Sequence, residues 1–198
     1  MIKRCLAALQ LLVSLSVFLS VAEAVASPLD EKEAITCPAS GHQLSPPDFS
    51  SAGCTTSFLS DVDPQNRLVW VKTTLDLDDT TGPNNEPLAI YISAKMASEF
   101  YLNGSFAGRN GVPGTSAKTE IYGKLDAVIH PPQNLFKVGA NEIIFKASSH
   151  HGVMNLENPI HFLAIDISSN VGDKTLRHYW PSFLTLGLFL FGIVYFAI

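Results

Sequence analysis

The sequence is poor in basic residues and in cysteine. Lys and Arg number 13 against 18 Asp and Glu, so the formal net charge is −5 at pH 7. No run of basic residues is present, and a protein surface that follows a phosphate backbone needs one. Nucleic-acid binding is therefore excluded. The chain holds only three cysteines among 198 residues, which leaves room for one disulfide and no disulfide-rich scaffold.

Sequence motifs of common enzymes are also absent. The chain contains no Gly-x-Ser-x-Gly elbow, no His-Glu-x-x-His motif and no cysteine nucleophile beside a plausible base. Glycines are frequent over residues 103–114, but Pro113 interrupts them and no Gly-Lys-Ser/Thr opens a helix, so a phosphate-binding loop is not indicated. We therefore expect a protein that is not an enzyme, and we predict no cofactor and no metal.

The first 26 residues have the order of a secretory signal peptide. Lys3 and Arg4 precede an apolar run from Cys5 to Val21, and small residues follow. Polar residues interrupt the run, which makes it a poor membrane span. We predict a signal peptide over 1–26, with a retained signal anchor as the alternative. The remainder of the chain is then expected to fold outside the cytoplasm.

Charge is absent from the other end as well. No charged residue occurs from Ser182 to Ile198, and Tyr179 and Trp180 stand where interfacial aromatic residues belong. This pattern predicts a transmembrane helix over 181–198, preceded by a juxtamembrane linker over 171–180. Because the sequence stops inside this apolar run, we expect a longer protein to continue beyond it.

Cys37 and Cys54 are the two cysteines that remain after signal cleavage. In an oxidising compartment they are expected to form a disulfide, worth about 3 kcal/mol in the chain-entropy model. A two-thiol metal site is the alternative, although no further ligands occur at zinc-finger spacing. The disulfide would staple an N-terminal segment over 27–64 that is rich in proline and glycine and shows no periodicity.

Apolar residues alternate with other residues from Arg67 onward, as in half-buried strands. The apolar sets begin at Val69, Leu88, Ile143 and Leu163, and turn residues separate them. No helical stripe of useful length appears before the apolar C-terminal run. The fold class predicted for 65–170 is all-β, a β-sandwich of the jelly-roll type.

An Asn-Gly pair lies between two apolar stretches at Asn103 and Gly104. This pair is typical of a two-residue type I′ turn, which needs positive φ at both positions. We therefore predict an antiparallel hairpin of strands 97–102 and 105–108. Asn103 also begins a glycosylation acceptor pattern, which we interpret as turn chemistry alone.

Two groups of motifs resemble known families. EFYLNG at 99–104 followed by FKVGANEII at 136–144 resembles the galactose-binding-like jelly roll. GRNGVPG at 108–114, GKLDA at 123–127 and SSHHG at 148–152 are similar to segments of the periplasmic sensor domains of bacterial membrane signalling proteins. These include the seven-transmembrane receptors with diverse intracellular signalling modules and the ectodomains of histidine kinases.

The resemblance implies a periplasmic sensory domain that is anchored in the bacterial inner membrane by a single pass of this chain. It implies a small carbohydrate-like or other polar ligand, and a cytoplasmic histidine kinase or cyclase effector that no part of this sequence encodes. The alternative is an envelope-anchored structural or protein-interaction module without a small-molecule ligand.

Arg109, Asn110, His150 and His151 are the candidate ligand-binding residues. Planar polar groups such as Arg109 and Asn110 bond two neighbouring hydroxyls or a carboxylate at once. Histidine titrates near neutrality and suits a ligand or pH-sensing role. Loops gather at the rims of a jelly roll, so we expect these four residues to meet at one rim.

Two metal sites remain as alternatives in the sequence. Adjacent histidines point to opposite faces of a strand, so His150 and His151 would share a metal only from a loop, with His130 or His161 nearby. The aspartates at 76, 78 and 79 form a cluster of a kind that can hold calcium with backbone oxygens, but that is more often a solvated strand end.

Overall fold

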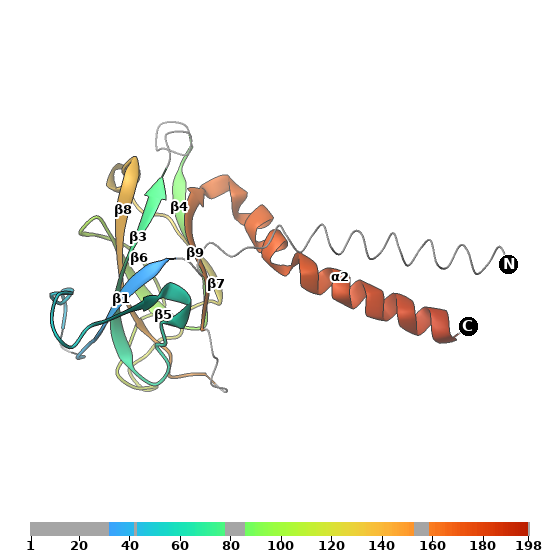
Figure 1. Cartoon of the computed structure of the whole chain (residues 1–198), viewed down its shortest axis with the longest axis horizontal. Coiled ribbons are helices and arrows are strands. Elements are labelled where there is room, and N and C mark those ends of the chain that lie inside the picture. The colour runs from blue at the N-terminus through green and yellow to red at the C-terminus, as the bar shows by residue number, and fades with distance from the viewer. Residues whose placement is uncertain (1–31, 42, 78–85, 153–158, 198) are drawn as a thin grey trace. The chain divides into compact units, whose positions relative to one another are not determined.

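The computed structural model describes residues 32–41, 43–77, 86–152 and 159–197 (Figure 1). The chain divides into two compact units. One is a β-rich unit from Pro28 to Val171, and the other contains the C-terminal helix. The predicted signal peptide, 1–26, lies outside the described residues.

Two antiparallel sheets build the β-rich unit, which confirms the β-sandwich class. The larger sheet has the order β2-β1-β3-β8-β5-β6, and the smaller has the order β7-β4-β9. The strands of the larger sheet are β1 Glu33–Pro38, β2 Thr55–Phe58, β3 Leu68–Leu77, β5 Ala97–Leu102, β6 Ser105–Asn110 and β8 Gly139–Ser148. The strands of the smaller sheet are β4 Leu88–Ala94, β7 Asp126–Ile129 and β9 Ile160–Ile167. The described residues also include three short 3-10 helices: η1 Leu59–Asp61 between β2 and β3, η2 Gln133–Leu135 between β7 and β8, and η3 Ser168–Asn170 after β9.

Alternating apolar side chains from both sheets form the main core, as the period-two pattern predicts. Val71 of β3 is fully buried there, and Phe100 and Phe145 pack with ring centroids 5.2 Å apart. β4 differs from the prediction because all seven of its residues are buried. It is the central strand of the smaller sheet, and Tyr91 donates its hydroxyl hydrogen to the Ile167 carbonyl at 2.8 Å.

The stapled N-terminal segment is part of the larger sheet rather than a separate unit. β1 pairs with both β2 and β3, so residues 27–64 add two strands that the irregular composition had not indicated. The predicted disulfide joins Cys37 to Cys54, with Cα atoms 4.2 Å apart. Cys37 lies on the second face of this sheet in a small cluster with the buried Trp70 and Ile144.

The predicted hairpin is confirmed between β5 and β6. Asn103 and Gly104 both have positive φ, 49° and 84°, as a type I′ turn requires. The register shifts between Phe100 and Tyr101, which pair with Gly108 and Phe106, so Ala107 forms a bulge in β6. β6 runs two residues further than predicted, to Asn110.

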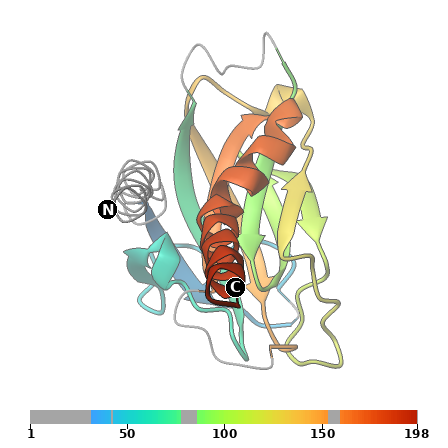
Figure 2. The ribbon, with the colours of Figure 1, turned by 90° about the vertical axis from the view of Figure 1, so that its right-hand side faces the viewer.

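The helix α2 spans Val171–Ala197, and Figure 2 shows it as one unbroken ribbon. The residues predicted as a linker, 171–180, are therefore helical. Pro181 lies inside the helix, and its carbonyl accepts a hydrogen bond from the Thr185 hydroxyl at 2.9 Å. Within the described residues, no helix has both the length and the apolar character that crossing a membrane requires.

Candidate functional site

A buried carboxylate, Glu120, joins the loop between β6 and β7 to the residues at the end of β8, which are 28 to 30 positions away in the sequence. Its side chain is only 1% exposed. The Ser148 hydroxyl donates to one carboxylate oxygen, and the His150 backbone N–H donates to both oxygens at 3.0 and 3.1 Å. Gly114 completes the junction, because its N–H donates to the Ser148 hydroxyl at 2.9 Å and its carbonyl lies 3.0 Å from His150 Nε2. The loops after β6 and β8 therefore meet, as the sequence predicts.

The loop between β6 and β7 folds back on itself with its two arms in contact. Val112 and Ile121 exchange two backbone hydrogen bonds of 2.7 and 2.9 Å. A Cβ on Gly111 would stand 2.2 Å from the Ile121 carbonyl oxygen, and one on Gly114 would stand 2.5 Å from the Glu120 nitrogen. Gly111 and Gly114 are thus required by close backbone packing between the two arms, and this packing brings Glu120 to Ser148.

Asn110 fixes the second arm of this loop. Its side-chain oxygen accepts the Lys124 N–H at 2.8 Å, and its side-chain nitrogen donates to the Lys124 carbonyl at 2.7 Å. Gly123 passes so close that a Cβ there would lie 2.6 Å from the Asn110 side chain. Both hydrogen-bonding groups of the buried Asn110 amide are therefore occupied within the protein, and its role is to hold the loop.

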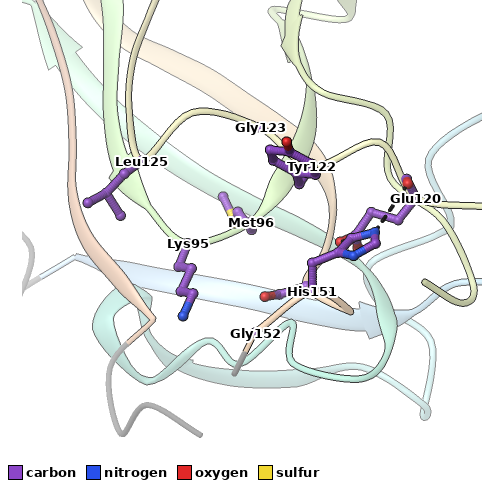
Figure 3. A pocket seen from close by; sticks show the side chains of 9 residues that line it. Lys95, Met96, Glu120, Tyr122, Gly123, Leu125, His151 and Gly152 are labelled. Carbon is purple, nitrogen blue, oxygen red and sulfur yellow. Dashed lines mark hydrogen bonds and ion pairs between the residues drawn. The ribbon is translucent and has the colours of Figure 1, made fainter. Parts of the chain in front are cut away.

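A pocket of about 360 Å³ opens beside Glu120 (Figure 3). Its lining comes from the β4–β5 turn, the 120–125 arm and the segment after β8. The lining residues are Lys95, Met96, Glu120, Tyr122, Gly123, Leu125, Ser149, His151 and Gly152. The pocket thus forms where these three lining segments meet.

The pocket walls combine apolar surface with two basic side chains. Tyr122 is 73% exposed and Leu125 is 46% exposed, while Met96 is buried and forms an apolar part of the lining. The imidazole of His151 meets the Tyr122 ring edge to face, with centroids 5.7 Å apart. His151 Nε2 is 4.0 Å from a Glu120 carboxylate oxygen and 3.4 Å from the Glu120 carbonyl. Figure 3 shows the Lys95 side chain and His151 around this hollow. Such a site offers stacking, hydrogen bonding and positive charge to a small molecule.

The structure separates the four candidate residues that the sequence suggested. Only His151 lines the pocket. The His150 ring is bonded to Gly114 at the junction, and Asn110 holds the neighbouring loop. Arg109 is exposed on β6, directly opposite Glu99 of β5 in the register of the larger sheet, and it does not line the pocket.

Neither alternative metal site is supported by the described residues. Among them, no three His, Cys, Asp or Glu side chains gather closely enough to hold a metal ion. Asp76 is an exposed residue of β3 that lies between the buried Leu75 and Leu77. Asp78 and Asp79 lie outside the described residues.

Sequence reasoning missed most of the pocket lining. Lys95 and Met96 sit in a two-residue connection between β4 and β5 that carries no motif. Glu120 offered one signal, since it is the only acidic residue between Arg109 and Asp126. A single acid in a long loop is a weak signal, because most such residues are solvated.

Comparisons with known proteins leave the family open. No family model matches the chain, and no curated protein matches it. Among solved structures, a β-glucosidase from Kluyveromyces marxianus aligns with a TM-score of 0.36 and 14% sequence identity. The alignment covers 78% of this chain and 20% of that one, so the chain spans about a fifth of the enzyme's length.

Proposed function

We propose that this protein is a sensory domain of jelly-roll type that binds a small, carbohydrate-like polar ligand and is tethered to a membrane. The pocket beside Glu120 is the observation that carries the proposal. Its volume of about 360 Å³ falls at the small end of the range for ligand sites, roughly 300 to 1,000 Å³. Its lining pairs exposed aromatic and aliphatic surface with a few polar groups, which is the usual composition of such sites.

Two of the three sensor-like motifs supply residues to the pocket lining, and the third, at 108–114, is bonded to one of these two. GRNGVPG at 108–114 and SSHHG at 148–152 are bonded to each other through Gly114, Ser148 and His150. GKLDA at 123–127 supplies Gly123 and Leu125 to the lining. The three segments that carry the resemblance are therefore bonded to one another around one pocket, and this supports a shared binding role.

The pocket is connected to α2 by one backbone hydrogen bond and by the chain from β9 to the helix. The backbone N–H of Lys95 donates to the Pro159 carbonyl at 3.1 Å, immediately before β9 begins. β9 continues through η3 into α2 at Val171. A ligand that binds two states of the pocket with different affinities would shift their populations, and β9 would transmit the shift to the helix.

The proposed membrane tether and the proposed periplasmic location both rest on the sequence. The charge-free run at 182–198 and the signal-like residues at 1–26 favour a single pass through a bacterial inner membrane, with the sandwich in the periplasm. A histidine kinase or cyclase effector on the cytoplasmic side would receive the signal. Resistance of the full chain to alkaline extraction from membranes would support the tether, and release into the supernatant would oppose it.

Ligand binding is tested with the full chain in detergent and a panel of neutral and acidic monosaccharides. We expect at least one sugar to raise the melting temperature, and we expect Tyr122→Ala to abolish the shift because it removes the exposed ring from the pocket wall. Ile121→Ala is the matched control, since Ile121 is also exposed but does not line the pocket. A panel that leaves the melting temperature unchanged, or equal effects of the two variants, would count against the proposal.

An interaction module is the second candidate, and one surface favours it. β6 is an edge of the larger sheet, and Phe106 on it is 54% exposed and packs edge to face on Tyr101. Exposed edges and aromatic side chains are common in protein contacts. Cross-linking to a partner protein that is lost in Phe106→Ser, but is retained in variants of the pocket residues, would favour this candidate.

A further inference from the structure

We infer that the ligand of the pocket is a uronic acid, a pyranose whose ring carries a carboxylate. The inference rests on the proposed function, because it names the ligand class for the same site. Three features of the lining support it: a carboxylate that is withdrawn from the pocket, a lysine that has no partner among the described residues, and an aromatic ring at the opening.

The carboxylate oxygens of Glu120 are bonded to the protein and are not presented to a ligand. Its side chain is 1% exposed, and its oxygens already accept hydrogen bonds from the Ser148 hydroxyl and the His150 N–H. His151 stands beside it, with Nε2 at 4.0 Å from the nearer carboxylate oxygen. A ligand therefore meets the imidazole before it meets the carboxylate. A cationic ligand would have to displace bonds that hold the loops together, so the site disfavours a cation.

Lys95 supplies a positive charge that no described residue neutralises. It lines the pocket, and within the described residues its ammonium group makes no ion pair and no hydrogen bond to another group. A lysine ammonium carries three hydrogen-bond donors and no acceptor. A ligand carboxylate satisfies these donors with charge-assisted hydrogen bonds, which are about twice as strong as neutral ones.

The apolar part of the lining suits a sugar ring. Tyr122 is largely exposed, and Met96 and Leu125 add aliphatic and thioether surface. The C–H-rich face of a pyranose packs on such a ring, while its hydroxyls remain available to polar groups. The volume of about 360 Å³ limits the occupant to a ligand about the size of a monosaccharide. Ring packing and a single carboxylate together describe a uronic acid.

The test measures binding of D-glucuronate and of D-glucose to the full chain in detergent by isothermal titration calorimetry at neutral pH. The two sugars differ only in the carboxylate. We expect glucuronate to bind more tightly, and we expect Lys95→Met to weaken it by about 10-fold or more while leaving glucose unchanged. Lys118→Met is the matched control, because Lys118 is exposed on the β6–β7 loop that carries Glu120 and does not line the pocket. D-galacturonate and D-galactose form a second pair.

The outcomes separate the inference from the proposed function. If glucose or galactose binds as tightly as the uronates, and Tyr122→Ala abolishes this binding, the inference of a uronic acid is overturned. The proposal of a sugar-binding pocket then remains. Uronate binding that is insensitive to Lys95→Met, or equally sensitive to Lys118→Met, also overturns it. The absence of uronate binding overturns the inference, and the absence of binding across the monosaccharide panel overturns the proposed function as well.

Discussion

Asn103 and Asn141 are joined by a side-chain hydrogen bond of 3.0 Å across 38 residues of sequence. Asn103 occupies the positive-φ hairpin turn, and Asn141 is completely buried near the start of β8. Asn103 also donates to the Leu135 carbonyl and accepts the Glu142 N–H. The two asparagines of the LNG and GAN motifs thus lock the β5–β6 turn to the chain entering β8, which gives these motifs a structural reason.

Replacing Asn141 with Ala should destabilise the sandwich substantially. Its amide donates to the Lys137 and Gly139 carbonyls and accepts the Lys137 N–H, in addition to the bond from Asn103. Losing buried hydrogen bonds and leaving their partners unsatisfied should lower the free energy of unfolding by about 2 to 4 kcal/mol in urea titration.

Asn134→Ala is the control for this prediction. Asn134 is exposed in η2, so its replacement should change stability by no more than about 0.5 kcal/mol. Equal stability of the two variants would show that the asparagine network contributes little.

Removing the disulfide should loosen the second face of the larger sheet. We expect Cys37→Ala combined with Cys54→Ala to lower the free energy of unfolding by about 3 kcal/mol, because the unfolded chain gains conformational freedom. The half-cystines pack with the buried Trp70, so acrylamide should quench tryptophan emission more strongly in the double variant. Adding reductant to the double variant is the control and should change nothing. Unchanged unfolding of wild-type protein after complete reduction would contradict the prediction.

Gly111→Ala should destabilise the loop that carries Glu120. The added Cβ would lie 2.2 Å from the Ile121 carbonyl oxygen, and the residue has φ of +79°. Both features strain an L residue, and we expect a loss of about 2 kcal/mol or more in the free energy of unfolding. Gly53→Ala is the matched control, since no atom lies within 4 Å of a Cβ at that position. A Gly111→Ala protein as stable as Gly53→Ala would refute the close packing of the two loop arms.

The pKa of Tyr91 and that of Tyr101 are both raised above the ordinary value of 10.0. Burial is the main cause in each case, and the negative charges of Asp166 and Glu99, respectively, add to it. The folded state therefore disfavours the phenolate. The contribution of each neutral hydroxyl to the free energy of unfolding is fully present below the pKa that the tyrosine has in the unfolded chain. It is lost as pH rises through the raised pKa of the folded chain.

Alkaline titration followed by phenolate absorbance checks this directly. The Tyr91→Phe and Tyr101→Phe variants should each lose amplitude from the part of the curve above the ordinary tyrosine range. Below that range their curves should overlie the wild-type curve. Amplitude lost at or below the ordinary range instead would show that these two hydroxyls are not held in their neutral form.

The sequence by itself determined the features that depend on neighbouring residues. Alternation along Leu68–Leu77 identified which side chains of β3 enter the core, because successive side chains of a strand point to opposite faces. Asn103 and Gly104 determined the hairpin, because few other residues tolerate positive φ twice. The disulfide followed from there being one pair of cysteines beyond the signal-like segment.

Only the tertiary structure decided the pocket. Lys95, Glu120 and His151 are brought together by the order of strands in two sheets, and that order depends on packing between distant segments. The same long-range packing placed β1 beside β3 and buried both faces of β4. It also assigned Asn110 and His150 to holding the loops, because a polar side chain buried at a junction must find its hydrogen bonds inside the protein.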